Sequence, residues 1–220
     1  MFEDASMLRL LGLIAALLAC YAAVPAEAMQ FSLLNDGSGG RIVSARGVIG
    51  PGDAGRLARA LSRASIDRHG TRALWLDSPG GSVVDAMEMA DVIGALGVTT
   101  VVRGKAMCAS ACASVVFVAG KYRRIDKGGQ LLIHSCFDAR NGEKMDECDL
   151  AISQRAAANG LSGRAMMAFQ EVAPGPRYGV LFNAADAACF GLTRAPGKAE
   201  LGDNAPCVRQ VLHAARKKKQ

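Results

Sequence analysis

Residues 78–83 read Ser-Pro-Gly-Gly-Ser-Val, and two further short segments follow them: Cys-Ala-Ser-Ala-Cys-Ala at 108–113 and Leu-Ile-His-Ser at 132–135. Each segment alone is a weak signal, because Pro-Gly-Gly marks any tight turn and a serine between small residues is common. Their order is informative, since they offer in turn an oxyanion hole, a nucleophile and a base. Gly81 lies 29 residues before Ser110, and Ser110 lies 24 residues before His134. The first interval has room for a helix and a strand.

These motifs and their order resemble the Clp-type peptidases of the crotonase-like superfamily, and the resemblance extends from about Arg41 to Leu192. It implies an α/β chain with the crotonase-like (ClpP-like) fold of repeated β-β-α units, in which a largely parallel sheet is flanked by helices. It also implies a serine hydrolase, and a peptide or protein as its substrate follows from the family alone.

The resemblance assigns a role to each residue of the expected site. Ser110 is the nucleophile and His134 is the base that takes its proton. The backbone N–H groups of Gly81 and Ala111 form the oxyanion hole, close to a helix start, where unpaired N–H groups and the helix dipole stabilise negative charge. Glycine is expected at 81 because substrate must approach the backbone there. The alternative is that Gly80 and Gly81 only make a turn between a strand and a helix.

Other nucleophiles near Ser110 are Ser114, Cys108 and Cys112. A hydroxyl is a poor nucleophile until a neighbouring base takes its proton, so the choice depends on which serine a histidine can reach. A thiol-redox role for the two cysteines requires accessible thiols, whereas a structural role requires that neither reacts in the native protein.

Other bases are less well placed than His134, which ends an expected strand. His69 lies in a polar turn and His213 lies near the C-terminus. A lysine-based dyad, as in signal-peptide peptidases of the same superfamily, would use Lys105 or Lys121. Nothing in the sequence places either lysine near the nucleophile.

The third member of the family's catalytic triad is missing from this chain. Alignment of residues 183–192 with the family's closing helix puts Gly179 where the family has an aspartate. Asp186 matches a position in the helix and is explained as helix N-terminal charge after an Asn183 cap. His134 is then oriented by Asn183, by a backbone carbonyl or by water, and the site is a Ser-His dyad whose efficiency is in doubt.

Hydrophobic periodicity, caps and turn residues predict an alternation of strands and helices. A hairpin is expected from strands at 31–34 and 41–48, followed by a helix at 54–64 and a strand at 73–76. A helix from Val83, capped by Ser82, should bury Val83, Met87, Ala90 and Ile93 or Gly94 and end at Gly97. The later elements expected are a strand at 98–103, a buried helix at 108–118, a strand at 130–134, and helices at 146–158, 162–172 and 183–192.

In Clp peptidases the region of the helices at 146–158 and 162–172 helps subunits stack into a chamber. Here this region is charged and contains a cysteine, so the resemblance does not predict assembly into a ring. A homo-oligomer remains one of the expected alternatives. Met166, Met167 and Phe169 are expected in the core or at a subunit contact.

The first 28 residues are expected to be an export signal, with Arg9, an apolar run from Leu10 to Val24 and Ala-Glu-Ala at 26–28. The mature chain would then comprise a crotonase-like domain at 29–205 and a basic tail at 206–220. A periplasmic location is expected. The alternatives are attachment to the membrane by an uncleaved signal or by a lipid on Cys20.

Six of the seven cysteines lie outside this leader: Cys108, Cys112, Cys136, Cys148, Cys189 and Cys207. An oxidising compartment would allow up to three disulfides, and the sequence does not choose among fifteen complete pairings. The alternative is that several are small buried residues. No pair has C-x-x-C spacing and the chain has three histidines, so no zinc site and no cofactor is expected.

The net charge says less about the binding partners of this protein than the motifs do. The formal net charge is +6, partly because of Arg-Lys-Lys-Lys at 216–219, and no aromatic-basic interleaving points to nucleic acid. Two functions outside hydrolysis also fit the sequence. One is an inactive family member that binds peptides or proteins in the old cleft. The other is an acyl-thioester enzyme that uses only the oxyanion hole, against which export and the paired serine and histidine argue.

Overall fold

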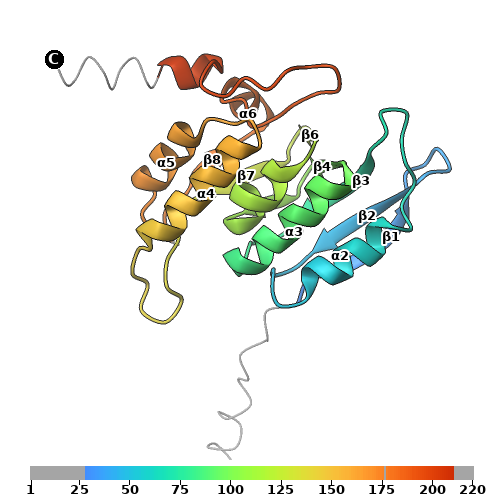
Figure 1. Ribbon diagram of the computed structural model, residues 1–220, viewed down its shortest axis with the longest axis horizontal. Helices are drawn as coiled ribbons and strands as arrows, with labels where there is room; N and C mark the ends of the chain where they lie inside the picture. Colours follow the sequence, from blue (N-terminus) through green and yellow to red (C-terminus); the bar gives the residue numbers. More distant parts are fainter. Residues whose placement is uncertain (1–27, 176, 211–220) are drawn as a thin grey trace, which may run out of the picture.

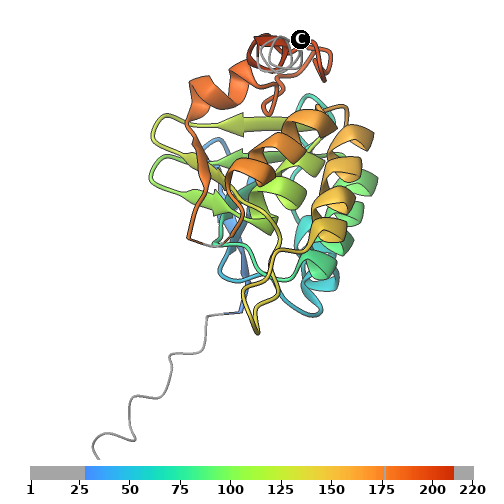
Figure 2. The same cartoon turned by 90° about the vertical axis from the view of Figure 1, so that its left-hand side faces the viewer.

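The structure, a computed structural model, describes residues 28–175 and 177–210 and contains two β-sheets with most of the helices on one side (Figures 1 and 2). The strands are β1 (Gln30–Asn35), β2 (Arg41–Arg46), β3 (Arg72–Asp77), β4 (Val98–Val102), β5 (Met107–Ala109), β6 (Tyr122–Ile125), β7 (Gln130–Ile133) and β8 (Val180–Phe182). The helices are α2 (Asp53–Leu61), α3 (Val83–Leu96), η1 (Cys112–Val116), η2 (Phe117–Ala119), α4 (Asp146–Ala158), α5 (Gly163–Val172) and α6 (Ala184–Cys189).

The larger sheet has the strand order β1-β2-β3-β4-β6, and the smaller sheet has the order β5-β7-β8. β1 and β2 form the expected hairpin, with Phe31 paired to Ala45 in an antiparallel register. The pairs β2–β3, β3–β4 and β4–β6 are all parallel. The prediction of a largely parallel sheet flanked by helices is therefore confirmed. Parallel strands require crossover connections, and α2 and α3 provide them.

The helix α3 begins and ends where the sequence indicates. The Ser82 hydroxyl accepts a hydrogen bond from the Asp85 N–H, and Gly97 ends the helix in the left-handed conformation. Its buried face was predicted in part: Ala90 and Ile93 face the core as expected, and Ala86 and Met89 join them. Val83 and Met87 line a cavity instead. The helix is apolar almost all round, so its periodicity marks the core face poorly.

The segment from Met107 to Ala119 departs from the expected single helix. Residues 107–109 form the short strand β5, which pairs with β7, and a buried π-helical turn and a 3₁₀ turn follow. Every residue from Ala111 to Ala119 is buried. The expectation of a buried apolar helix at 108–118 is therefore right for 112–118 and wrong for 108–109, where non-local strand pairing overrides the local pattern.

The last third of the described chain follows the sequence closely. The helix α4 has the predicted bounds, and Ser162 caps α5 by accepting from the Ala165 N–H. Asn183 and Asp186 form a reciprocal capping box at α6. Met166 and Phe169 are buried in the core, and the Phe169 ring packs edge-on against Phe182 at 4.9 Å between centroids.

The six cysteines of the described residues pair as Cys108–Cys112, Cys136–Cys148 and Cys189–Cys207. Among the described residues no helix is long and apolar enough to cross a membrane. The predicted export signal and most of the basic tail lie outside these residues, so both stay predictions.

Candidate active site

Two neighbouring strands of the smaller sheet bring Ser110 and His134 to the same edge. β5 and β7 run parallel, with Ala109 paired to Leu132, and the Ser110 N–H donates to the Leu132 carbonyl at 2.8 Å. Ser110 follows β5 directly, and His134 follows β7 directly. Because the carboxyl ends of parallel strands meet at one edge of a sheet, the two side chains reach the same region.

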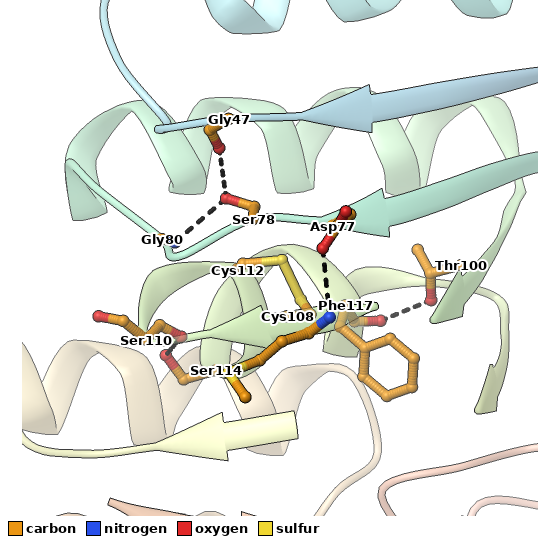
Figure 3. Close-up of a disulfide and its surroundings, with 11 residues drawn as sticks. Gly47, Asp77, Ser78, Gly80, Thr100, Cys108, Ser110, Cys112, Ser114 and Phe117 are labelled. Atoms are coloured by element: carbon orange, nitrogen blue, oxygen red, sulfur yellow. Dashed lines mark hydrogen bonds between the residues drawn. A yellow bond between two sulfur atoms is a disulfide. The ribbon is translucent and has the colours of Figure 1, made fainter. Parts of the chain in front are cut away.

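The Pro-Gly-Gly turn is fastened beside Ser110 by backbone hydrogen bonds. The Ser78 N–H donates to the Met107 carbonyl at 2.8 Å, and the Ala109 N–H donates to the Ser78 carbonyl at 2.9 Å. The buried Ser78 hydroxyl donates to the Gly47 carbonyl and accepts from the Gly80 N–H (Figure 3). The turn is therefore held from both sides, with its backbone next to the nucleophile.

The contact of Gly81 with Ile49 also requires glycine at this position. A Cβ atom there would lie 2.2 Å from the carbonyl oxygen of Ile49, and φ is +146°. The neighbouring segment of the chain itself therefore excludes a side chain at position 81. The expectation based on substrate approach stays a prediction.

Two backbone N–H groups at this place have no acceptor within the described residues. Within the part of the chain that the structure describes, neither the Gly81 N–H nor the Ala111 N–H donates to a protein acceptor. Gly81 is exposed to solvent, and Ala111 lies at a helix start, where backbone N–H groups lack partners within the helix. Such donors stabilise the negative charge that develops on a carbonyl oxygen during acyl transfer.

One cavity of about 950 Å³ joins all four predicted residues, Gly81, Ser110, Ala111 and His134. Its remaining wall is mostly apolar and includes Val48, Ile49, Val83, Val84, Met87, Phe137, Met145 and Ile152. Ser110 has φ of +56°, an uncommon conformation for a residue with a side chain. Figure 3 shows its side chain pointing away from the Cys108–Cys112 disulfide.

The competing nucleophiles have structural roles. The Ser114 hydroxyl donates to the Ser110 carbonyl at 3.0 Å and is buried (Figure 3). Cys108 and Cys112 are both fully buried and joined to each other on either side of Ser110. The thiol-redox role needs accessible thiols, and this pair offers none.

The ring of His134 is held in one tautomer by the backbone. Its Nδ1 atom lies 2.7 Å from the carbonyl oxygen of Ser135. A carbonyl oxygen accepts and cannot donate, so Nδ1 carries the hydrogen and Nε2 is left as the basic nitrogen. The Phe137 ring packs against the imidazole at 5.6 Å between centroids. No hydrogen bond joins His134 to Ser110 among the described residues, and such contacts are often long before substrate binds.

Of the three orienting groups expected for His134, the structure shows the backbone carbonyl. The Asn183 side chain is occupied at the start of α6, where its oxygen accepts from the Ala185 and Asp186 N–H groups. Gly179 directly precedes β8, and His134 directly follows β7. Because Ile133 pairs with Val180 in the antiparallel register, extension by one residue places Gly179 opposite His134. A Cβ on Gly179 would lie 2.6 Å from Leu132 Cδ2, so a side chain at this position requires the half-buried Leu132 side chain to move.

The alternative bases lie elsewhere. His69 lines a separate cavity of about 1000 Å³, together with Arg103 and Tyr122. Lys105 lines a third cavity with Arg46, and the Lys121 ammonium lies 5.5 Å from the Tyr122 ring centroid. Neither lysine lines the cavity of Ser110, and His213 lies outside the described residues.

The sequence did not indicate that Ser135 and Asp149 belong to this region. Asp149 is buried on α4, and its carboxylate accepts hydrogen bonds from the Ser135 hydroxyl and from the Cys136 N–H, the latter at 2.7 Å. An acidic residue in the first turn of a helix is ordinary. The contact spans thirteen or fourteen residues of chain and leaves no local signal.

Comparison with known proteins agrees with this architecture. The family model described as Clp protease matches residues 40–167, which is more than half of the chain. The chain is similar in structure to the ClpP protease catalytic domain from Plasmodium falciparum, with a TM-score of 0.50 and 16% sequence identity over 69% of this chain and 84% of that chain. No curated protein matches the chain. The structural likeness, at this identity, supports the fold.

Proposed function

Because this chain belongs to the Clp protease family, we propose that it is a serine peptidase that works with a Ser110–His134 dyad and a backbone oxyanion hole. The observation that carries the proposal is the single cavity that brings together Ser110, His134 and the free N–H groups of Gly81 and Ala111. Nucleophile, base and oxyanion donors are the three parts that acyl transfer requires.

In the proposed reaction the Ser110 oxygen attacks the carbonyl carbon of the peptide bond, and His134 Nε2 takes the hydroxyl proton. The carbonyl oxygen becomes an oxyanion that accepts from the N–H groups of Gly81 and Ala111. Collapse of this intermediate breaks the C–N bond, and the imidazolium returns its proton to the leaving amine. Water then repeats the cycle on the acyl-enzyme and releases the acid.

The apolar wall of the cavity favours a substrate with an apolar side chain beside the scissile bond. Val83, Met87, Phe137 and Met145 are within this wall, and burial of an apolar side chain contributes about 1.5–3 kcal/mol. Methionines adapt to side chains of different shape. Short or already unfolded polypeptides are the natural substrates of an exported peptidase, because ATP for an unfolding partner is scarce outside the cytoplasm.

We also propose that the protein is exported to the periplasm after removal of residues 1–28, with a membrane-held form as the alternative. Support comes from the apolar leader of the sequence. The three disulfides give independent support, because disulfides form and persist in oxidising compartments.

The second candidate function is a binding module that holds peptides in the same cavity without cleaving them. It is favoured by one observation: among the described residues no carboxylate contacts the His134 ring, which meets a neutral carbonyl instead. The orienting carboxylate normally contributes strongly to rate.

A fluorophosphonate probe distinguishes the two candidates, because it reacts covalently with an activated serine. The oxidised mature protein is expected to be labelled, and Ser110→Ala and His134→Ala are each expected to abolish labelling with the fold intact by circular dichroism. Absence of labelling in folded wild-type protein, while a control hydrolase reacts, would favour the binding module.

A further inference from the structure

Asp149 is a buried carboxylate that the proposed reaction does not use. It lies in the first turn of α4 and is 1% exposed. Its Oδ2 accepts a hydrogen bond from the Ser135 hydroxyl, and its Oδ1 accepts from the Cys136 N–H at 2.7 Å. The Lys144 ammonium lies 3.6 Å from Oδ2. A buried carboxylate is costly unless it is paired and hydrogen-bonded, and these contacts supply both conditions.

The Cys136 N–H and the Ser135 carbonyl belong to the same peptide unit. The described residues contain no cis peptide bond, so the two groups point in opposite directions from one plane. The N–H faces Asp149, and the carbonyl oxygen lies 2.7 Å from His134 Nδ1. One rigid unit thus connects a negative charge to the imidazole.

The disulfide Cys136–Cys148 covalently joins the segment after β7 to α4 at the same place. Cys136 adjoins Ser135 in the chain, and Cys148 adjoins Asp149. The disulfide therefore keeps the carboxylate and the peptide unit in register, beside the cavity that both cysteines line.

On the premise of the proposed function, we propose that Asp149 is a positioning residue that orients and polarises His134 through the Ser135–Cys136 peptide. A negative charge at the N–H end of a peptide strengthens its carbonyl as an acceptor, because hydrogen bonds in a chain polarise one another. The carbonyl then holds the hydrogen on Nδ1 and stabilises the imidazolium when Nε2 takes the Ser110 proton. Asp149 thus acts on His134 from α4, whereas a carboxylate at position 179 would first require the Leu132 side chain to move.

The test compares Asp149→Asn, Ser135→Ala and Asp53→Asn in the oxidised mature protein. Asn keeps the size and an acceptor for the Cys136 N–H while it removes the charge. Asp53 is the matched control, since it is also fully buried and accepts from a backbone N–H at 2.7 Å, that of Gly50, and it lies outside the cavity.

Two readouts are used, the fluorophosphonate labelling rate of Ser110 and the NMR resonance of the His134 Nδ1 hydrogen in ¹⁵N-histidine protein. Asp149→Asn is expected to slow labelling about 10- to 100-fold, the effect typical of groups that orient a functional histidine, and to move the resonance upfield. Ser135→Ala removes one of the two hydrogen bonds that Asp149 accepts from residues 135 and 136, and should have a smaller effect on both readouts. Asp53→Asn should lower stability and change neither.

Wild-type labelling rate and an unchanged resonance in Asp149→Asn would overturn the proposal. If Asp149→Asn does not fold, Ser135→Ala decides, and no change in either readout overturns it. Failure of the wild type to label would count against the peptidase function alone, because the resonance still reports whether Asp149 orients His134.

Discussion

Gly80 lies directly against Ser110, so that a Cβ atom on Gly80 would stand 2.7 Å from the Ser110 Cβ and 2.7 Å from the Ala109 carbonyl oxygen. Its φ of +96° separately favours glycine. The Gly80 carbonyl accepts from the Ile49 N–H at 2.8 Å, which links the turn to the other side of the cavity. Any shift of this turn moves the Gly81 N–H, the proposed oxyanion donor, relative to Ser110.

Gly80→Ala is therefore expected to slow labelling of Ser110 at least tenfold, as small displacements at a reacting centre do. It should also lower the free energy of unfolding by about 1–3 kcal/mol through strain and overpacking. The control is Gly94→Ala in α3, where nothing lies within 4 Å of an added Cβ. This variant should gain about 0.5–1 kcal/mol and label normally. Equal labelling in both variants would contradict the role of the turn.

Replacement of Cys108–Cys112 by alanines and replacement of Cys189–Cys207 by alanines should affect stability and the labelling rate of Ser110 in opposite order. Closure of the 4-residue loop stabilises by about 2 kcal/mol and closure of the 18-residue loop by about 3 kcal/mol. The first replacement should cost less stability yet slow labelling, because that disulfide brackets Ser110. Urea unfolding and labelling rates measure both effects. Faster labelling in Cys108→Ala/Cys112→Ala than in the other double variant would refute this expectation.

Gly179→Asp alone should not improve the site, because its Cβ meets Leu132 at 2.6 Å. Overpacking of this kind costs about 1–3 kcal/mol. The double variant Leu132→Ala/Gly179→Asp clears the space and puts a carboxylate opposite His134, so we expect it to label faster than Leu132→Ala alone. No gain in the double variant, with folding intact, would show that Gly179 does not face the imidazole.

Asp203 provides a pH-dependent contact between the C-terminal segment and α5. Side-chain hydrogen bonds from Arg164, and then from Ser162, hold the pKa of the Asp203 carboxyl below its ordinary value of 3.8. A lowered pKa stabilises the folded state fully above that ordinary value, and the contribution is lost as pH falls through the folded-state pKa. Because Asp203 is partly exposed, the effect is about 0.5 kcal/mol or less. Unfolding free energies of wild type and Asp203→Asn should differ near pH 6 and converge near pH 2.

The features predicted best from the sequence were those whose causes are local. Ser82, Ser162 and Asn183 cap the helices that follow them because a side-chain oxygen can satisfy N–H groups two or three residues ahead. The bounds of α4 follow from similar local chemistry. The four candidate residues that the motifs indicated also line one cavity. The labelling experiment tests their chemical roles.

The features that the sequence did not predict depend on contacts distant in the chain. The strand β5 exists because Cys108 pairs with Leu131, 23 residues away, and local composition favoured a helix there. The need for glycine at 81 comes from Ile49, and the partner of Ser135 comes from α4. Three-dimensional neighbours of this kind leave no period, cap or turn signal in a single sequence.

The three disulfides join consecutive cysteines in the order of the chain, with separations of 4, 12 and 18 residues. Each loop can therefore close while the polypeptide emerges N-terminus first, before the next cysteine pair has appeared. An oxidant that acts on neighbouring thiols as they arrive produces the native pairing without later exchange.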